Sequence, residues 1–287
     1  MVYSQQAQAH TSLALIKALV ALGVLLAGYW SAWQWFLYRL AESPVEVFCL
    51  LGVLIFFGGL FFRGLILSKQ IYAPPMLFLS SLFLVYGLLS IFQAPNIVTS
   101  GVAFSSLCLF FYCVSAGRMP PAGFWGVCLL AAPIVPSLQF VLGYPARMLS
   151  AIITIPMLQA QGFAVSREGV YLKWQSELLQ FDAPCSGISM LWAALFFGSC
   201  VAYLLQLKWR RYLLFCFAAC LACIIGNVVR ACSLFYLQNG VLSDNKIPAF
   251  IDADTLHQAV GAVSFLAIIS VLIAALLLMQ TREGLMK

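Results

Sequence analysis

The stretch Asp182-Ala183-Pro184-Cys185-Ser186-Gly187-Ile188 opens an apolar run, Ser186–Leu207, that contains no charged residue. A helix needs about 20 apolar residues to cross the hydrocarbon core of a bilayer, and this run is long enough. The whole chain has the same character, because 63% of its 287 residues are hydrophobic and 8% are charged. Soluble domains carry about 25% charged residues, so the composition excludes a soluble protein. The sequence predicts an integral membrane protein.

Working outward from this run, we expect an all-α polytopic membrane protein with about eight transmembrane helices. No long polar region separates the apolar runs, so residues 1–287 are expected to form a single integral membrane domain. The predicted spans are Ala18–Leu37, Val47–Phe62, Pro75–Phe92, Ile97–Ala116, Ala122–Leu142, Ser186–Leu207, Tyr212–Tyr236 and Leu256–Met279.

The longest connection, residues 143–185, lies between the fifth and sixth spans. It begins with an expected surface helix, Ala146–Gln159, and continues with short, partly alternating segments. These segments are Phe163–Ser166, Val170–Trp174 and Leu178–Asp182, with a turn expected at Glu168-Gly169. We interpret the connection as a small extracytoplasmic cap, and residues 186–279 as the helices that carry the chemistry.

Charge patterning predicts the orientation of the chain. Cytoplasmic loops carry an excess of Lys and Arg, and long loops count less toward this rule. With eight spans, the side of the two termini receives Arg63, Lys69, Arg118, Lys208, Arg210, Arg211, Arg282 and Lys287. The other side receives Arg39, Arg147, Arg167, Lys173 and Lys246, three of them in the long connection. The termini are therefore expected in the cytoplasm. The formal charge of +6 needs no nucleic-acid partner to explain it.

Three residues with the chemistry of a cysteine nucleophile are expected on one membrane face. Cys185 opens the run Ser186–Leu207, Arg230 lies late in the next run, and His257 opens the last. Consecutive membrane helices alternate in direction, so these three ends share a side. A thiol in the first turn of a helix has a lowered pKa. An arginine at membrane depth usually faces a cavity or a partner. Histidine is the most common general acid and base.

Four neighbouring residues support this site. Ser186 places a hydroxyl beside the thiol, and Gly187 lets another chain approach closely. Asn227 lies one turn before Arg230 on the same helix face and is expected to orient the guanidinium. Asp254 is expected to cap the last helix near His257. No metal or organic cofactor is expected.

These residues carry a family resemblance. The three segments that resemble the signature sites of the exosortase/archaeosortase family are Ala183-Pro184-Cys185-Ser186-Gly187-Ile188, Asn227-Val228-Val229-Arg230 and His257. The segments that resemble the part preceding the nucleophile in exosortases are Gly143-Tyr144-Pro145 through Gly162, Glu168-Gly169-Val170 and Leu178–Asp182. The similarity runs from about Gly143 to the C-terminus, and the earlier spans match in hydropathy alone.

The resemblance implies a transpeptidase of the bacterial inner membrane with its active site on the periplasmic face. Its substrates would be membrane-anchored proteins with a C-terminal sorting signal, often a Pro-Glu-Pro motif followed by a transmembrane helix and a basic tail. By motif, Cys185 would be the nucleophile that forms a thioester, His257 the acid and base, and Arg230 the stabiliser of thiolate or oxyanion. The acyl group would pass to an acceptor that the sequence does not name.

Two other functions fit the residues. In a transporter or channel, Arg230 would bind an anion and Cys185 would be incidental, and such a protein would be expected to show paired broken helices or internal symmetry. In a membrane acyltransferase, Cys185 would carry a fatty acyl group. Replacing Cys185 by alanine separates the first from a transpeptidase, and the mass of the species trapped on Cys185 separates the second.

Overall fold

The computed structural model places the chain in two compact units, each described here by itself. The first comprises residues up to Ile134 together with Ala202–Trp209, and the second comprises Val135–Val201 together with residues from Arg210 onward. The residues that the structure describes are 16–42, 50, 54, 58, 73–116, 121–174, 177–180, 186–238 and 253–284. Within these ranges, the side chains at 73–76, 113, 115–116, 177–180, 238, 253–254, 256–257 and 278–284 are excepted. The expectation of a single membrane domain stays a prediction.

The first unit begins with two helices instead of the one straight span predicted over Ala18–Leu37. The helix Ile16–Gly28 and α2 (Trp30–Glu42) meet at a bend of 70°. The first helix ends at Gly28, and the ring of Phe83 occupies the space that a side chain at residue 28 would need. The fully buried Tyr29 then donates a hydrogen bond to Ser106 Oγ at 3.0 Å.

Two further helices of the first unit follow the prediction closely. The spans predicted over Pro75–Phe92 and Ile97–Ala116 correspond to α4 (Ala73–Ile91) and α5 (Asn96–Ala116). The span predicted over Val47–Phe62 lies mostly outside the described residues.

The fifth predicted span, Ala122–Leu142, is wrong as a continuous helix. α6 (Ala122–Leu130) ends early, and a new helix, α7 (Val135–Ala160), begins after a short turn. Pro133, which lies in that turn, has no backbone N–H to continue the helical ladder, and it restricts the residue before it. Hydropathy does not register this break, because proline and its apolar neighbours leave the run hydrophobic.

The separate surface helix predicted over Ala146–Gln159 is also wrong, because these residues form the second half of α7. Pro145 and Pro156 lie inside α7 without ending it. Interior prolines are tolerated where neighbouring groups satisfy the backbone they release. As a result Arg147, expected on a surface helix, lies near the middle of a helix long and apolar enough to cross a membrane.

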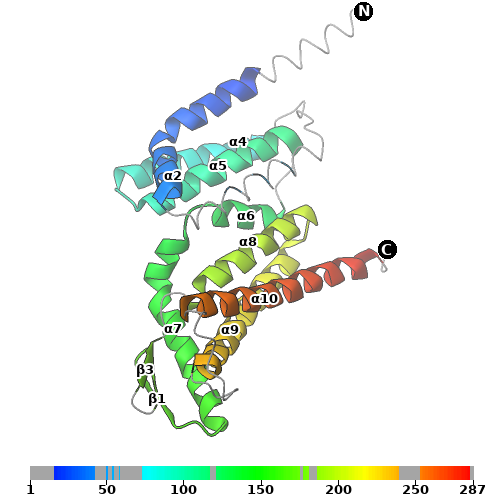
Figure 1. The fold of residues 1–287 in the computed structure, drawn as a ribbon. Coiled ribbons are helices and arrows are strands. Elements are labelled where there is room, and N and C mark those ends of the chain that lie inside the picture. The colour runs from blue at the N-terminus through cyan, green and yellow to red at the C-terminus, as the bar shows by residue number, and fades with distance from the viewer. Residues whose placement is uncertain are drawn as a thin grey trace, which may run out of the picture. The chain divides into compact units, whose positions relative to one another are not determined.

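A small antiparallel sheet follows α7, close to the predicted short segments. Its strands are β1 (Val165–Glu168), β2 (Tyr171–Trp174) and β3 (Glu177–Gln180), in the order β1-β2-β3. The turn predicted at Glu168-Gly169 is confirmed, since Glu168 pairs with Tyr171 and Gly169 has φ +62°. Figure 1 shows the sheet beside the C-terminal end of α7.

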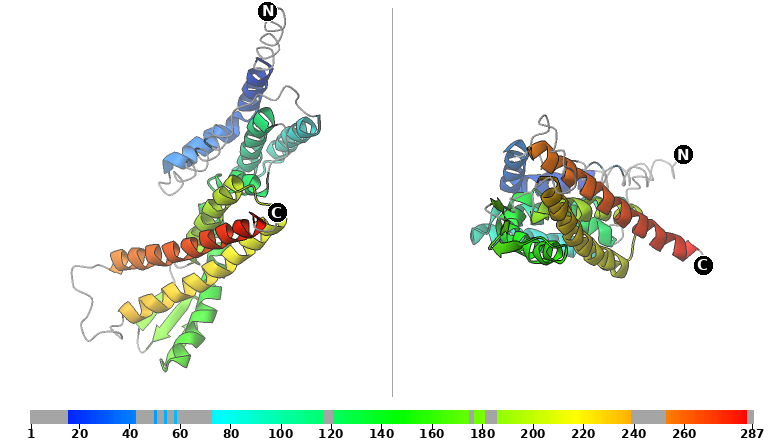
Figure 2. Two further views of the ribbon diagram at one scale, coloured as in Figure 1. Left: turned by 90° about the vertical axis from the view of Figure 1, so that its right-hand side faces the viewer. Right: turned by 60° about the horizontal axis from the view of Figure 1, so that its bottom comes forward.

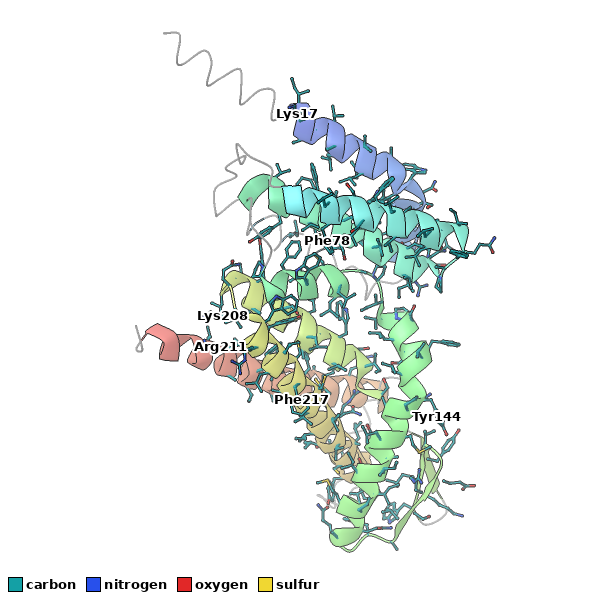
Figure 3. The ribbon with its side chains drawn as sticks, turned by 180° about the vertical axis from the view of Figure 1, so that it is seen from behind. Lys17, Phe78, Tyr144, Lys208, Arg211 and Phe217 are labelled. Atoms are coloured by element: carbon teal, nitrogen blue, oxygen red, sulfur yellow. The ribbon has the colours of Figure 1, made fainter. Side chains whose placement is uncertain are left out.

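Three long helices complete the second unit: α8 (Ile188–Leu204), α9 (Trp209–Gln238) and α10 (Ala253–Gly284). The sheet packs on α7 and α9 through a buried cluster that includes Leu158, Val165, Leu172 and Phe235. In Figure 2, α9 and α10 run side by side. Arg211 lies in the first turn of α9, at the end away from the sheet (Figure 3).

The described helices identify a multi-pass membrane protein. Val135–Ala160, Trp209–Leu237 and Gln258–Leu277 are long and apolar enough to cross a membrane, and the bent pair Ile16–Gly28 and Trp30–Glu42 can form a fourth span. Three shorter apolar helices, Leu77–Ile91, Asn96–Tyr112 and Ile188–Leu204, accompany them. Eight spans and an extracytoplasmic cap remain predictions.

Candidate active site

The start of α8 is built by Ser186 and Gly187. The carbonyl of Gly187 accepts the first hydrogen bond of the helix, from the N–H of Leu191 at 2.9 Å. The hydroxyl of Ser186 accepts a hydrogen bond from the N–H of Ile188 at 3.3 Å and so satisfies one of the N–H groups left open at a helix start. Gly187 has φ +73°, a conformation that favours glycine.

The observed start of α8 bears on one expectation about Cys185. We expected the thiol in the first turn of the helix, but α8 begins at Ile188, three residues later. The residue that accepts the first helical bond is Gly187, so its left-handed backbone separates the helix from the residues before it. Cys185 itself, like Asp182, lies outside the described residues.

Asn227 of α9 packs directly against Gly187. Its Cγ lies 3.1 Å from the position that a Cβ of Gly187 would occupy, and its side chain is buried. The amide nitrogen of Asn227 donates a hydrogen bond to Ser150 Oγ of α7 at 2.8 Å. A glycine at residue 187 is therefore required twice, by its backbone conformation and by this close approach. The expected orientation of the Arg230 guanidinium by Asn227 stays a prediction.

Arg230 lies one turn after Asn227 and is buried, with 8% of its surface exposed. Its guanidinium packs on Gly261 of α10, with Cζ and Nη2 each 3.2 Å from the position of a Cβ there. A second glycine, Gly226, lets Ile268 of α10 reach the backbone of α9. Small residues in helix interfaces allow such close packing. A buried guanidinium offers donors in one plane that suit an oxyanion.

The contacts define the directions of the helices. Gly187, which directly precedes α8, meets Asn227 of α9, and Gly198 of α8 meets Phe215 of α9, so these two helices are antiparallel. Contacts of Gly226 with Ile268 and of Gly261 with Arg230 make α9 and α10 antiparallel as well. The start of α8, the later part of α9 and the start of α10 therefore lie toward one end of the second unit, as predicted from alternating membrane helices.

The contacts above involve Ser186, Gly187, Asn227, Arg230 and Gly261, which we call the cluster. Its position along α9 follows from helix geometry. Asn227 lies eleven residues before the end of α9 at Gln238, about 16 Å along the axis at 1.5 Å per residue. Arg230 lies about 12 Å before the same end. The sheet packs against Phe235, closer to that end. The cluster thus lies farther from the C-terminal end of α9 than the sheet does.

His257 and Asp254 are described by their backbone alone. Both lie in the first turns of α10, which begins at Ala253, so Asp254 is inside the helix and not before it as expected of a cap. His257 precedes Gly261 by one turn, and residues four apart share a helix face. The backbone therefore places His257 on the face of α10 that meets Arg230, one turn nearer the start of the helix.

Two residues of α7 belong to the cluster and were missed by the sequence reasoning. Gln139 accepts a hydrogen bond from the hydroxyl of Ser186 at 2.8 Å, and Ser150 accepts one from Asn227. A signal was present, since both are polar residues in an apolar helix, where such side chains usually face the protein interior. The incorrect division between Ala122–Leu142 and Ala146–Gln159 separated them and hid their common helix.

Other features of the described residues lie elsewhere. An apolar cavity of about 450 Å³ lies in the first unit, lined in part by Leu82, Val98, Trp125 and Leu129. Among the described residues, no group of three or more His, Cys, Asp or Glu side chains has an arrangement that could hold a metal ion. This leaves the expected absence of a metal untested, because Cys185 and the side chain of His257 are outside that set.

Comparison with known proteins and families identifies the family of this chain. Neither a curated protein nor a solved structure matches it. The family model described as transmembrane exosortase matches residues 17–274, which is nearly the whole chain. The match includes the early spans, where the sequence showed resemblance in hydropathy alone, and it does not favour the transporter or the acyltransferase. With its apolar helices and its signature segments gathered in one unit, the chain belongs to the transmembrane exosortase family.

Proposed function

We propose that this exosortase-family protein is a membrane cysteine transpeptidase that removes C-terminal sorting signals from exported proteins. One observation carries the proposal. Segments far apart in sequence meet in the second unit, where Gly187 packs on Asn227 and Arg230 packs on Gly261. These contacts join the three segments in which the sequence predicts the nucleophile, the cation and the histidine.

Cys185 is the proposed nucleophile. It is the residue before Ser186, whose hydroxyl is held by Gln139, so it is attached directly to the cluster. Its thiolate attacks the carbonyl carbon of the scissile peptide bond and forms a tetrahedral oxyanion. Collapse of this intermediate breaks the C–N bond and leaves a thioester on the sulfur. An acceptor nucleophile then attacks the thioester, forms the new acyl bond and releases the Cys185 thiolate.

Arg230 and His257 have complementary roles in this scheme. The Arg230 guanidinium is buried, and fixed donors in a water-poor site stabilise developing negative charge strongly. His257 donates a proton to the leaving amine and later accepts one from the acceptor. Its backbone position, one turn from the glycine beneath Arg230, supports this division of roles.

The proposed substrate is a protein anchored by a C-terminal transmembrane helix, with its sorting motif at the outer face of the bacterial inner membrane. Such a helix reaches the enzyme laterally within the bilayer, so its scissile bond arrives at the depth of the cluster and not from bulk water. The sheet β1-β2-β3, which packs near the C-terminal end of α9, is the proposed extracytoplasmic cap.

Co-expression with a candidate substrate tests the proposal. A substrate with a C-terminal tripartite signal is produced with the wild type, with Cys185→Ala, or with Cys232→Ala, a control in α9 two residues after Arg230. Intact-mass analysis is expected to show loss of the C-terminal helix with the wild type and the control alone, and any added mass identifies the acceptor. Processing by Cys185→Ala would contradict a thioester mechanism.

A further inference from the structure

One face of α7 carries two polar residues that form hydrogen bonds with Ser186 and with Asn227 of α9. Gln139, Gly143 and Ser150 stand at positions i, i+4 and i+11 and so share one face of this helix. Ser150 is buried, and Gln139 is half-buried. The two polar residues are about 16 Å apart along the axis. They therefore contact the cluster at different residues, Gln139 at Ser186 and Ser150 at Asn227.

Gln139 holds the start of α8. Its Oε1 accepts the hydroxyl hydrogen of Ser186 at 2.8 Å, while the same hydroxyl oxygen accepts the N–H of Ile188. The hydroxyl of Ser186 is thereby used in both directions, toward α7 and toward its own helix. Rotation of Ser186 would break one of these hydrogen bonds, so Gln139 restrains the residue next to Cys185.

Ser150 holds Asn227. It accepts the Asn227 amide N–H at 2.8 Å and donates its own hydrogen to the carbonyl of Ala146 at 3.0 Å. Asn227 cannot move away from α7 without breaking this chain, and its side chain fills the space beside Gly187. Ser150 therefore holds Asn227 in place, and the backbone at Gly187 packs against Asn227.

We propose that Gln139 and Ser150 are positioning residues of the transpeptidase, which hold the backbone beside Cys185 in register with Arg230 through Ser186 and Asn227. This inference rests on the proposed function. Misplacing a reacting group by about 1 Å can cost about 100-fold in rate. Removing either residue is expected to lower kcat by about 10- to 100-fold, with little change in KM, because neither contacts the substrate in this scheme.

The alternative role for these hydrogen bonds is general adhesion between membrane helices. The chain offers matched controls for this. Ser199 of α8 donates to the carbonyl of Leu195 at 2.6 Å and is hydrogen-bonded to the hydroxyl of Tyr212 at 2.8 Å, the same pattern as Ser150. Gln159 of α7 donates to the carbonyl of Val165 at 2.8 Å, so it is a hydrogen-bonded glutamine of the same helix, with the opposite direction of donation to that of Gln139. Both lie outside the cluster.

The experiment uses the full-length protein in nanodiscs with a purified substrate carrying a tripartite signal. Ser150→Ala and Gln139→Leu are compared with Ser199→Ala and Gln159→Leu, and Gln139→Glu restores the acceptor oxygen. Steady-state kinetics separates kcat from KM. A second readout needs no substrate: alkylation of Cys185 by iodoacetamide is followed against pH by peptide mapping. Loss of register with Arg230 is expected to raise the pH midpoint by about one unit.

Lower kcat and a raised midpoint in the two test variants alone, with recovery in Gln139→Glu, support the inference. Equal losses in the controls, a change in KM alone, or unchanged midpoints overturn it. If the wild type processes no substrate while the midpoints still shift, the proposed function fails and the positioning role stands. If neither processing nor a shift is seen, both are wrong.

Discussion

Replacing Gly187 by alanine is the sharpest test of the site, because two separate features of the structure oppose a side chain there. The φ angle of +73° is left-handed, and an L-residue with a Cβ adopts it at a cost of about 1–2 kcal/mol. The new methyl group would also stand 3.1 Å from Cγ and 3.3 Å from Cβ of Asn227. Asn227 is tied to Ser150 at 2.8 Å, so it cannot yield without straining that hydrogen bond.

Gly169→Ala is the matched control. Gly169 also has a left-handed φ, +62°, but no atom lies within 4 Å of its Cβ position. Gly169→Ala is expected to lose about 1–2 kcal/mol of stability, measured as a lower melting temperature in detergent, and Gly187→Ala is expected to lose more because of its contact with Asn227. Gly187→Ala alone is expected to lower processing turnover, by about 10- to 100-fold, because it displaces the segment next to Cys185.

Two outcomes would contradict the proposed importance of Gly187 packing. If Gly169→Ala loses as much turnover per folded molecule as Gly187→Ala, the loss reflects backbone strain in general and not the contact with Asn227. Normal turnover in Gly187→Ala would also refute the reasoning, since the packing of residue 187 would then be irrelevant to the chemistry.

Three further substitutions follow from the same contacts. Gly261→Ala should lower kcat, because its methyl group would stand 3.2 Å from Cζ of Arg230; Gly101→Ala, which has open space around its Cβ, is the control in the same kinetic assay. Arg230→Lys should lower kcat by more than about tenfold, since an ammonium lacks the planar fork of donors, and unchanged kcat would exclude an oxyanion role. Gly198→Ala should lower the melting temperature through its clash with the ring of Phe215, with turnover per folded molecule unchanged; an unaltered melting temperature would contradict the close packing of α8 on α9.

The predictions that succeeded depended on composition and on local pattern. Apolar runs long enough for a bilayer identified α4, α5, α9 and α10 with ends close to those observed. The alternating segments and the Glu168-Gly169 turn indicated the sheet, because a turn residue between short β-prone segments is a local signal. Alternation of helix direction placed the starts of α8 and α10 beside the later part of α9.

The predictions that failed concern breaks and joins inside apolar sequence. Hydropathy treated Ala122–Leu142 as one span, although Pro133 ends the run of α6, and it divided α7 where the helix in fact continues through Pro145. The bend at Tyr29 was missed for a related reason. It adjoins Gly28, whose side-chain space is filled by the ring of Phe83, and that contact joins residues far apart in the chain.

The sequence by itself determined that this is a membrane protein, which chemical groups it carries, and that its signature segments resemble those of one family. These properties follow from residue type and spacing, which act locally. The tertiary structure alone decided which glycines are filled by a neighbour and that Gln139 and Ser150 of α7 hold the start of α8 and Asn227. Such contacts depend on how helices pack in three dimensions. The hydrogen bond between Ser150 and Asn227 joins residues far apart in the sequence, so it produces no sequence pattern from which it could be predicted.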